Sequence, residues 1–324
     1  MHLQRRDFLG LATAASVCFA SRFAFSFEYP TKPVRLIVPF AAAGSTDMVG
    51  RLIGQWLSER LGQQFVIENR PGGGTTIGTE AVVNALPDGY TLLLASTAGA
   101  IGATLYEKLN FKFVDDIAPV AGIVRVPMVM EVHPSFPAKT VPEFIAYARA
   151  NPGKINLASS GIGTSPHVAG ELFKIMAGIN MVHIPYRGGA PALADLLGGR
   201  VQVFFDALPS SIELIKAGRL RPLAVTTLSR SDALPNVPSM SEFLSHYEAS
   251  SWFGVGAPKN TPVEIIRKLN KEINEGLNNP RMLARFAEMG GTTLPGSPED
   301  FGQFIVDETE KWGKVVRLSG AKPE

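Results

Sequence analysis

Apolar runs alternate with amphipathic segments along the first half of the chain. Residues 34–39 form an apolar run, and residues 48–57 then place apolar side chains three or four positions apart, which is the spacing of a helix. A second strand is predicted over 64–68 and a second helix over 77–85. Residues 90–95 are nearly all apolar, as in a strand that is covered on both faces. Strands that alternate with helices predict an α/β fold with a mostly parallel sheet.

The same alternation begins again near the middle of the 324-residue chain, which is long enough for two domains. Strands are predicted over 126–132, 156–159, 181–185, 201–206 and 223–227, with helices from Thr140, over 164–176 and over 190–197. From Trp252 onward the pattern predicts a mainly helical segment. There, residues 261–264 have the pattern of a capping box that opens a helix ending at Leu277, and residues 298–318 form the last helix.

The first 26 residues have the pattern of an export signal. Arg5 and Arg6 precede an apolar stretch over residues 11–20, and the order Arg-Arg-x-Phe-Leu resembles a twin-arginine signal. Small residues over 24–26 offer a cleavage site, and the apolar stretch is too short to span a bilayer. We therefore predict an exported protein that is cut after Ser26.

Removal of this segment changes the composition of the mature chain. It removes Cys18, the only cysteine, so that no disulfide, cysteine zinc site or thiol nucleophile is expected. It also removes three of the 31 basic and one of the 29 acidic residues, which leaves 28 of each. A formally neutral chain gives no sign of a nucleic-acid or membrane-surface partner. The five histidines show no metal-ligand spacing, so neither a metal nor a cofactor is predicted.

The loop at residues 41–47 is the first candidate site. Its small residues lie between a predicted strand and a predicted helix, where unpaired backbone N–H groups and the helix dipole favour an anion. An ordinary capped turn explains the same residues equally well. The candidate ligand-binding residues here are Ala42, Ala43, Ser45, Thr46 and Asp47.

The stretch ASSGIGTSPH at residues 158–167 is the second candidate site. A hydrolase elbow needs Gly-x-Ser-x-Gly, and no serine here has glycine at both positions. The stretch instead lies between a strand and a helix and suits a second anion cradle. The candidate residues are Ser159, Ser160, Gly161, Thr164 and His167. A serine hydrolase that uses Ser160 or Ser165 with His167 stays open as the alternative.

Two predicted strands end in polar residues. Ser96 and Thr97 follow the apolar strand at 90–95, and Asp206 ends the strand at 201–206. The carboxyl ends of strands are where open α/β sheets bind ligands, so all three are candidates. Asp206 is equally suited to cap the next helix. The glycines at 72–74 do not match a dinucleotide fingerprint, because Ile77 stands where the third glycine belongs.

Several motifs together carry a family resemblance. They are Val38-Pro39-Phe40, Gly44-x-Thr46-Asp47, Asn69-Arg70-Pro71-Gly72, Pro87-Asp88-Gly89-Tyr90, Gly161-x-Gly163-Thr164, Pro185-Tyr186-Arg187-Gly188-Gly189 and Leu223-Ala224-Val225-Thr226. In this order they resemble the Bug-type receptors of tripartite tricarboxylate carriers, which are periplasmic solute-binding proteins. The resemblance runs from about Tyr29 to the C-terminus.

The resemblance implies a type II periplasmic-binding-protein fold with a ligand cleft between two α/β domains. These would be residues 27–125 with 253–324, and residues 126–252. It also implies a monomeric, non-enzymatic periplasmic protein that binds a small organic carboxylate and delivers it to a membrane carrier, with no cofactor. A solute-sensing receptor of the same fold is the alternative.

The resemblance also assigns roles to the candidate residues. The loops at 41–47 and 159–164 would hold the ligand carboxylate, partly through ordered waters, and Asp206 would meet a polar group of the ligand. Two departures bear on the ligand. Ala43 stands where the family usually has glycine, and residues 98–103 make a smaller, more apolar wall.

Overall fold

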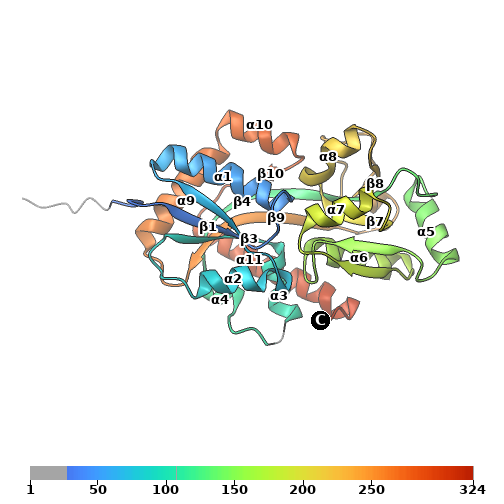
Figure 1. Ribbon diagram of the computed structural model, residues 1–324, viewed down its shortest axis with the longest axis horizontal. Coiled ribbons are helices and arrows are strands. Elements are labelled where there is room, and N and C mark those ends of the chain that lie inside the picture. The colour runs from blue at the N-terminus through green and yellow to red at the C-terminus, as the bar shows by residue number, and fades with distance from the viewer. Residues whose placement is uncertain (1–27, 107, 324) are drawn as a thin grey trace, which may run out of the picture.

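The computed structural model describes residues 28–106 and 108–323, so the predicted export signal lies outside the described residues (Figure 1). No helix in the described ranges combines the length and the apolar character needed to cross a membrane. The strands are β1 (Val34–Val38), β2 (Phe65–Asn69), β3 (Thr91–Ser96), β4 (Ile117–Val132), β5 (Asn156–Ser159), β6 (Val182–Pro185), β7 (Val203–Ala207), β8 (Arg221–Val225), β9 (Ser250–Pro258) and β10 (Thr292–Thr293). The α-helices are α1 (Ser45–Leu61), α2 (Thr76–Val83), α3 (Thr97–Leu105), α4 (Phe113–Asp116), α5 (Val141–Ala150), α6 (Ser165–Ala177), α7 (Gly189–Leu197), α8 (Leu208–Lys216), α9 (Val263–Leu277), α10 (Pro280–Glu288) and α11 (Pro298–Ser319). Two short 3₁₀ turns lie at Gly73–Thr75 and Met240–Glu242.

The strands are hydrogen-bonded in the order β2-β1-β3-β9-β4-β7-β5-β6, and β8 and β10 also pair with β4. The pairs among β1, β2 and β3, and those among β5, β6 and β7, are parallel. β4 and β9 run antiparallel to their neighbours. The prediction of a mostly parallel sheet is therefore right at the two ends of the sheet and wrong in its middle, where β4 and β9 pair antiparallel to each other and to their neighbours.

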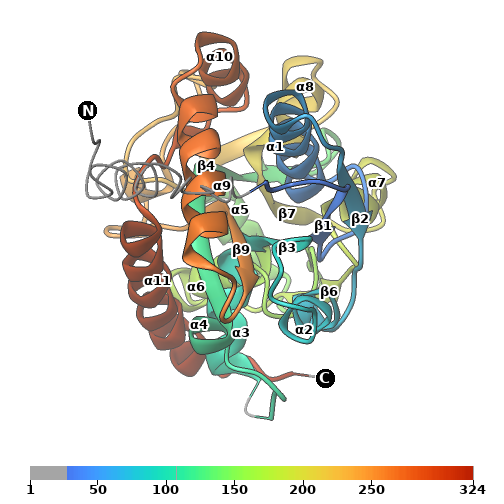
Figure 2. The ribbon, with the colours of Figure 1, turned by 90° about the vertical axis from the view of Figure 1, so that its left-hand side faces the viewer.

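The long strands β4 and β9 join the two ends of the molecule. The first part of β4 pairs with β9, and its last part, from Met128 to Val132, pairs with β7 and β8. One buried apolar cluster packs α1 and α9 against β1, β3 and β9, and another packs α5 and α6 against β5, β7 and the end of β4. Figure 2 shows α9 and α11 lying along β4 and β9.

Most predicted elements are confirmed within two residues, but the C-terminal segment needs two corrections. The segment from Trp252 onward is mainly helical, as predicted, but its first residues, up to Pro258, belong to the strand β9, all of whose residues are buried. A strand buried on both faces has no period to distinguish it from a buried helix. The predicted capping box is also wrong: the hydroxyl of Thr261 donates to the carbonyl of Pro258, and Pro262 stands at the N-cap of α9.

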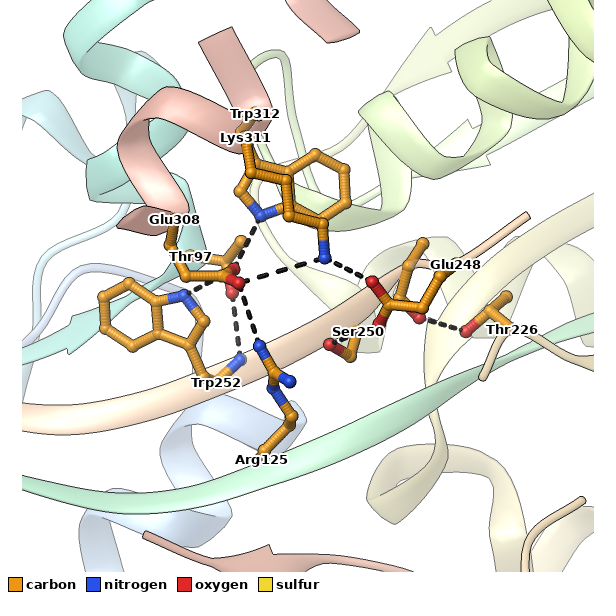
Figure 3. A network of polar contacts seen from close by, with 10 residues as sticks. Thr97, Arg125, Thr226, Glu248, Ser250, Trp252, Glu308, Lys311 and Trp312 are labelled. Carbon is orange, nitrogen blue, oxygen red and sulfur yellow. Dashed lines mark hydrogen bonds and ion pairs between the residues drawn. The ribbon is translucent and has the colours of Figure 1, made fainter. Parts of the chain in front are cut away.

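A buried carboxylate joins the crossing strands to α11 (Figure 3). Glu308, which is 4% exposed, accepts hydrogen bonds from the indole N–H groups of Trp252 at 3.1 Å and Trp312 at 2.9 Å. Arg125 of β4 donates to its other oxygen at 2.8 Å. The backbone N–H of Trp252 donates in turn to the hydroxyl of Thr97 at the start of α3 at 2.9 Å. One carboxylate thus links β4, β9 and α11.

We predict that Glu308→Gln destabilises the protein. Glutamine keeps the shape of the side chain but loses the charge that Arg125 and the two indoles meet, which should lower the free energy of unfolding by about 2 kcal/mol. Urea denaturation measures this loss. Glu310→Gln, an exposed carboxylate on the same helix, is the control and should leave the urea midpoint unchanged. Equal stability of the wild type and Glu308→Gln would contradict a central role for this carboxylate.

Candidate functional site

A small cavity lies where the beginnings of five helices meet. Its free volume is about 30 Å³, which is room for one or two water molecules. The lining residues from the first turns and caps of these helices are Gly44, Ser45 and Thr46 of α1, Ser96, Thr97 and Ala98 of α3, Thr164, Ser165 and Pro166 of α6, Gly189 of α7, and Asp206 and Ala207 of α8. Phe40, Ser160, Ser251 and Phe253 complete the lining. None of these residues carries a cationic side chain.

The five helices that meet at the cavity begin without a capping side chain at the N-cap position, although the first N–H of α1, that of Ser45, donates to the hydroxyl of Ser210 on α8. The N-cap positions of α1, α3, α6, α7 and α8 make no side-chain capping hydrogen bond. Away from this cavity the helix starts are of both kinds: α2, α4 and α9 also lack such a hydrogen bond, whereas Thr140, Asn279 and Ser297 accept one at the starts of α5, α10 and α11. Uncapped N–H donors and converging helix dipoles give the cavity a positive potential that suits an anion.

The hydroxyl groups of the lining fall into two sets. The hydroxyls of Ser165 and Ser251 bond to each other at 2.6 Å, and that of Thr164 donates to the carbonyl of Gly161 at 2.7 Å. The hydroxyls in the second set have no hydrogen-bond partner among the described residues and are left for a ligand. They belong to Ser45, Thr46, Ser96 and Ser160.

Asp47 orders the first loop from outside the cavity. Its carboxylate accepts hydrogen bonds from the backbone N–H of Ala43 at 2.9 Å, from Arg51 at 2.8 Å and from Asn69 at 3.0 Å. Burial raises the pKa of Asp47, but the hydrogen bonds from Arg51, Ala43 and Asn69 outweigh it and lower the pKa below its ordinary value. The carboxylate therefore holds the loop in shape, including the positive φ of 66° at Ala43.

Two stacked histidines support the second loop. The rings of His167 and His183 are stacked with 4.1 Å between centroids, and Nε2 of His183 lies 2.6 Å from the hydroxyl of Ser159. Burial lowers the pKa of His167 to about 3 and of His183 to about 4, and the charge of Lys174 adds to both shifts. The pKa of His167 is also lowered by electrostatic interaction with the imidazole of His183. Both rings are therefore neutral at physiological pH.

The arrangement lacks the contacts that a hydrolase using Ser160 or Ser165 requires. Nδ1 of His167 accepts the backbone N–H of Gly163 at 3.2 Å, and the hydroxyl of Ser165 bonds to Ser251. Neither candidate serine hydrogen-bonds to an imidazole in the described part of the chain. The Ser159 hydroxyl does meet an imidazole, but Ser159 is fully buried and cannot reach a substrate.

Asp206 is the one acidic residue that lines the cavity, and it is 1% exposed. Its carboxyl accepts the hydroxyl of Ser211 at 3.1 Å. Burial raises the pKa of Asp206 to about 7, although hydrogen bonds from Ser211, the backbone of Ala207 and Ser210 oppose the shift. Asp206 therefore takes up or loses a proton near neutral pH.

Seven of the thirteen predicted site residues line the cavity: Ser45, Thr46, Ser96, Thr97, Ser160, Thr164 and Asp206. The other six lie outside the lining, and their roles toward a ligand stay predictions: Ala42, Ala43, Asp47, Ser159, Gly161 and His167. Gly161 instead lines a neighbouring cavity of about 490 Å³, together with the glycine turn at 72–74 and Arg187. The two cavities share Phe40 and Ser160 as lining residues.

Sequence reasoning missed other lining residues. Phe40 and Gly189 belong to motifs of the family resemblance, and membership in these motifs is the sequence feature that could have identified them as site residues. Ser251 and Phe253 lie in β9, which was not recognised as a strand. Within the described residues, no group of three histidine, cysteine or acidic side chains is arranged to hold a metal ion.

Comparisons with known proteins place this geometry among relatives. The profile of the family described as "Tripartite tricarboxylate transporter family receptor" matches residues 49–320. Protein BugT of Bordetella pertussis is 39% identical over 297 residues, 91% of this chain and 91% of that protein. The structure of R. palustris Rpa4515 with adipate is 38% identical, has a TM-score of 0.89 and covers 91% of this chain and 100% of its own. MatC (Rpa3494) from Rhodopseudomonas palustris with bound malate is 28% identical, has a TM-score of 0.85 and covers 89% of this chain and 100% of its own.

We predict that His167 and His183 stay neutral between pH 7 and pH 5 in the folded protein. In the unfolded chain they titrate near pH 6.5, so the unfolded state binds more protons as the pH falls below that value. The contribution of the two rings to stability is therefore present above about pH 6.5 and is lost as the pH falls toward 4.

Ring-nitrogen NMR spectra recorded across this pH range check this prediction, with His167→Gln and His183→Gln used for assignment. The urea-unfolded protein is the control and should show both rings protonating. A protonation midpoint near pH 6.5 for either ring in the folded protein would contradict their burial as a neutral pair.

Proposed function

This chain belongs to the tripartite tricarboxylate transporter receptor family, and on that premise we propose that it captures a small organic carboxylate for delivery to a membrane carrier. Its likeness to solved binding proteins of this family confirms the type II periplasmic-binding-protein fold that the resemblance implied. The same family membership supports a binding role rather than catalysis. Export by the twin-arginine signal and residence in the periplasm are part of the proposal.

The convergence of five uncapped helix N-termini on one cavity is the observation that carries this proposal. A carboxylate there replaces the missing capping groups of several helices at once and gains from each dipole. The unbonded hydroxyls of Ser45, Thr46, Ser96 and Ser160 supply further donors. Because no cationic side chain lines the cavity, recognition depends on neutral donors at fixed positions, which report the geometry of the carboxylate as well as its charge.

The ligand class follows from the size and polarity of the two cavities. The inner cavity holds little more than a carboxylate group, and Phe40 and Phe253 add apolar surface to its wall. A ligand chain that passes Phe40 and Ser160 reaches the larger cavity, where Arg187 is part of the lining. The relatives solved with adipate and with malate support dicarboxylates as the first class to test.

We propose that the two domains are residues 27–125 with 253–324 and residues 126–252, and that they separate to admit the ligand. Contacts that cross between these two parts hold the cavity closed. The backbone N–H of Ser45 donates to the hydroxyl of Ser210 at 3.0 Å, and that of Ala41 donates to the carbonyl of Arg187 at 3.2 Å. The crossings in β4 and β9 would then serve as the hinge.

We predict that small carboxylates raise the melting temperature of the protein in a screen of mono-, di- and tricarboxylates. A ligand that binds only the folded state stabilises it by about 4 kcal/mol at a thousand times its Kd. Diols of the same chain length are the control, because they lack the charge that the helix N-termini attract. The proposal fails if no carboxylate shifts the melting temperature or if the matching diols shift it equally.

We predict that Thr46→Val weakens binding of the best carboxylate from this screen about five- to thirtyfold. Valine has nearly the same shape, and the change removes one hydroxyl that makes no hydrogen bond within the described residues, a loss of about 1–2 kcal/mol. Isothermal titration calorimetry measures the affinity, and the melting temperature of the free protein should be unchanged. Thr309→Val on α11, outside the lining, is the matched control for affinity. An unaltered Kd for Thr46→Val would exclude a contact between this hydroxyl and the ligand.

A further inference from the structure

Glu131 is a buried carboxyl group without a hydrogen bond of ordinary geometry. It lies on β4 opposite Phe204 of β7 and is completely inaccessible to solvent. Neither of its carboxyl oxygens makes a hydrogen bond of ordinary geometry among the described residues, although the hydroxyl of Ser211 lies near enough to oppose the rise of its pKa. A buried carboxylate without such hydrogen bonds costs several kcal/mol, so Glu131 is expected to hold a proton.

Glu131 faces the same side of the sheet as Asp206. Asp206 pairs with Val129, and Glu131 is two residues further along β4, so the two carboxyl groups project from the same face of neighbouring strands. Asp206 is itself buried and lines the ligand cavity. Asp206 of the cavity wall therefore has a second carboxyl group, that of Glu131, within electrostatic range.

No cation neutralises this pair from the elements around it. On β8, Arg221 donates to the carbonyls of Pro134, Phe136 and Ala138. Most charged groups on the neighbouring elements are paired with each other: Lys216 with Glu213 on α8, Asp195 of α7 with Arg200, and Arg230 with Glu242 beyond β8. Arg219, between α8 and β8, is exposed to solvent. The donors that reach the pair are neutral, namely the backbone N–H of Ala207 and the hydroxyls of Ser210 and Ser211, so at most one of the two carboxyls is ionised near neutral pH.

We propose that Glu131 and Asp206 form a proton-binding site in the wall of the ligand cavity, and that capture of a carboxylate is accompanied by uptake of a proton at Asp206 while Glu131 stays neutral. This inference rests on the proposed function. The proton comes from solvent and no covalent bond to the ligand forms.

The sign of the linkage follows from charge. A ligand carboxylate places negative charge in the cavity that Asp206 lines, which disfavours the ionised form of Asp206 and raises its pKa. The protonated acid then becomes a hydrogen-bond donor to a ligand oxygen. The site therefore favours carboxylates with a second oxygen near Asp206, such as dicarboxylates and hydroxy acids. A ligand amine near Asp206 would keep Asp206 ionised and take up no proton.

The first test needs no ligand and measures urea-unfolding curves between pH 5 and pH 8. In the unfolded chain Glu131 ionises above about pH 4.5, whereas in the folded protein burial and the charge of Asp206 raise its pKa and keep it neutral. The wild type therefore loses stability relative to Glu131→Gln as the pH rises, by up to tenfold in the folding equilibrium constant per pH unit. Glu213→Gln, an exposed carboxyl on α8, is the control and should follow the wild type. Curves for Glu131→Gln that run parallel to the wild type would overturn the proton site.

The second test measures proton uptake on binding, with adipate and each other carboxylate that raises the melting temperature. Titration calorimetry near pH 7.5, in buffers of different ionisation enthalpy, should show uptake of up to one proton per ligand. The affinity should fall toward tenfold per pH unit above pH 7. Asp206→Asn should abolish both effects, and Glu131→Gln should keep them, because glutamine resembles the neutral acid.

The two tests separate failure of this inference from failure of the proposed function. Binding without proton uptake, or equal uptake in Asp206→Asn, would overturn the linkage and leave carboxylate capture standing. Absence of any binding would reject both the proposed function and the linkage, while the unfolding curves would still decide whether Glu131 holds a proton in the free protein.

Discussion

The antiparallel pairing of β4 with β9 is the contact on which the rest of the molecule depends. Each strand passes through the middle of the sheet, so within the sheet the parallel strands at the two ends are joined through this pair. The hydrogen bonds and ion pair of Glu308 tie the pair to α11, and Thr97, which receives the backbone N–H of Trp252, lies in the cavity wall. The crossing strands are thereby linked through hydrogen bonds to a residue that lines the site.

The surroundings of the cavity contain groups that attract an anion and groups that repel one when they are ionised. Five helix N-termini favour an anion, whereas Asp206 and, behind it, Glu131 are carboxyl groups without a neutralising cation. Burial raises the pKa of both groups, which reduces the negative charge of this acidic pair near neutral pH. In the proposed function, the backbone donors and hydroxyls bind the ligand carboxylate, and the acidic side of the wall contacts the remainder of the ligand.

The residues near the cavity divide into those that touch its free space and those that hold the loops in place. Asp47 and the stacked pair of His167 and His183 belong to the second group, because their polar atoms are already bonded to the loop backbone or to neighbouring side chains. Binding sites that rely on neutral donors need this kind of support, because a displaced N–H group loses most of its interaction with the ligand. These internal bonds join His167 to the backbone of Gly163 and His183 to the hydroxyl of Ser159, and not to Ser160 or Ser165.

The sequence by itself determined the order and type of most elements and the two strand-to-helix loops. These depend on local periodicity, glycine and caps, which are written in neighbouring residues. It also indicated Asp206, because a carboxylate at the end of an apolar strand is a local signal.

Only the tertiary structure decided which loops meet and which groups are free. Glu131 is one of two ionisable residues in the otherwise apolar strand β4, and its proximity to Asp206 follows from the register of β4 with β7, more than seventy residues later in the chain. Ser251 reaches the cavity through β9, whose wholly buried sequence has no period to reveal a strand. Burial and hydrogen bonding are set by contacts between distant segments, so local pattern could name candidate residues but could not separate those that face the ligand from those that support the loops.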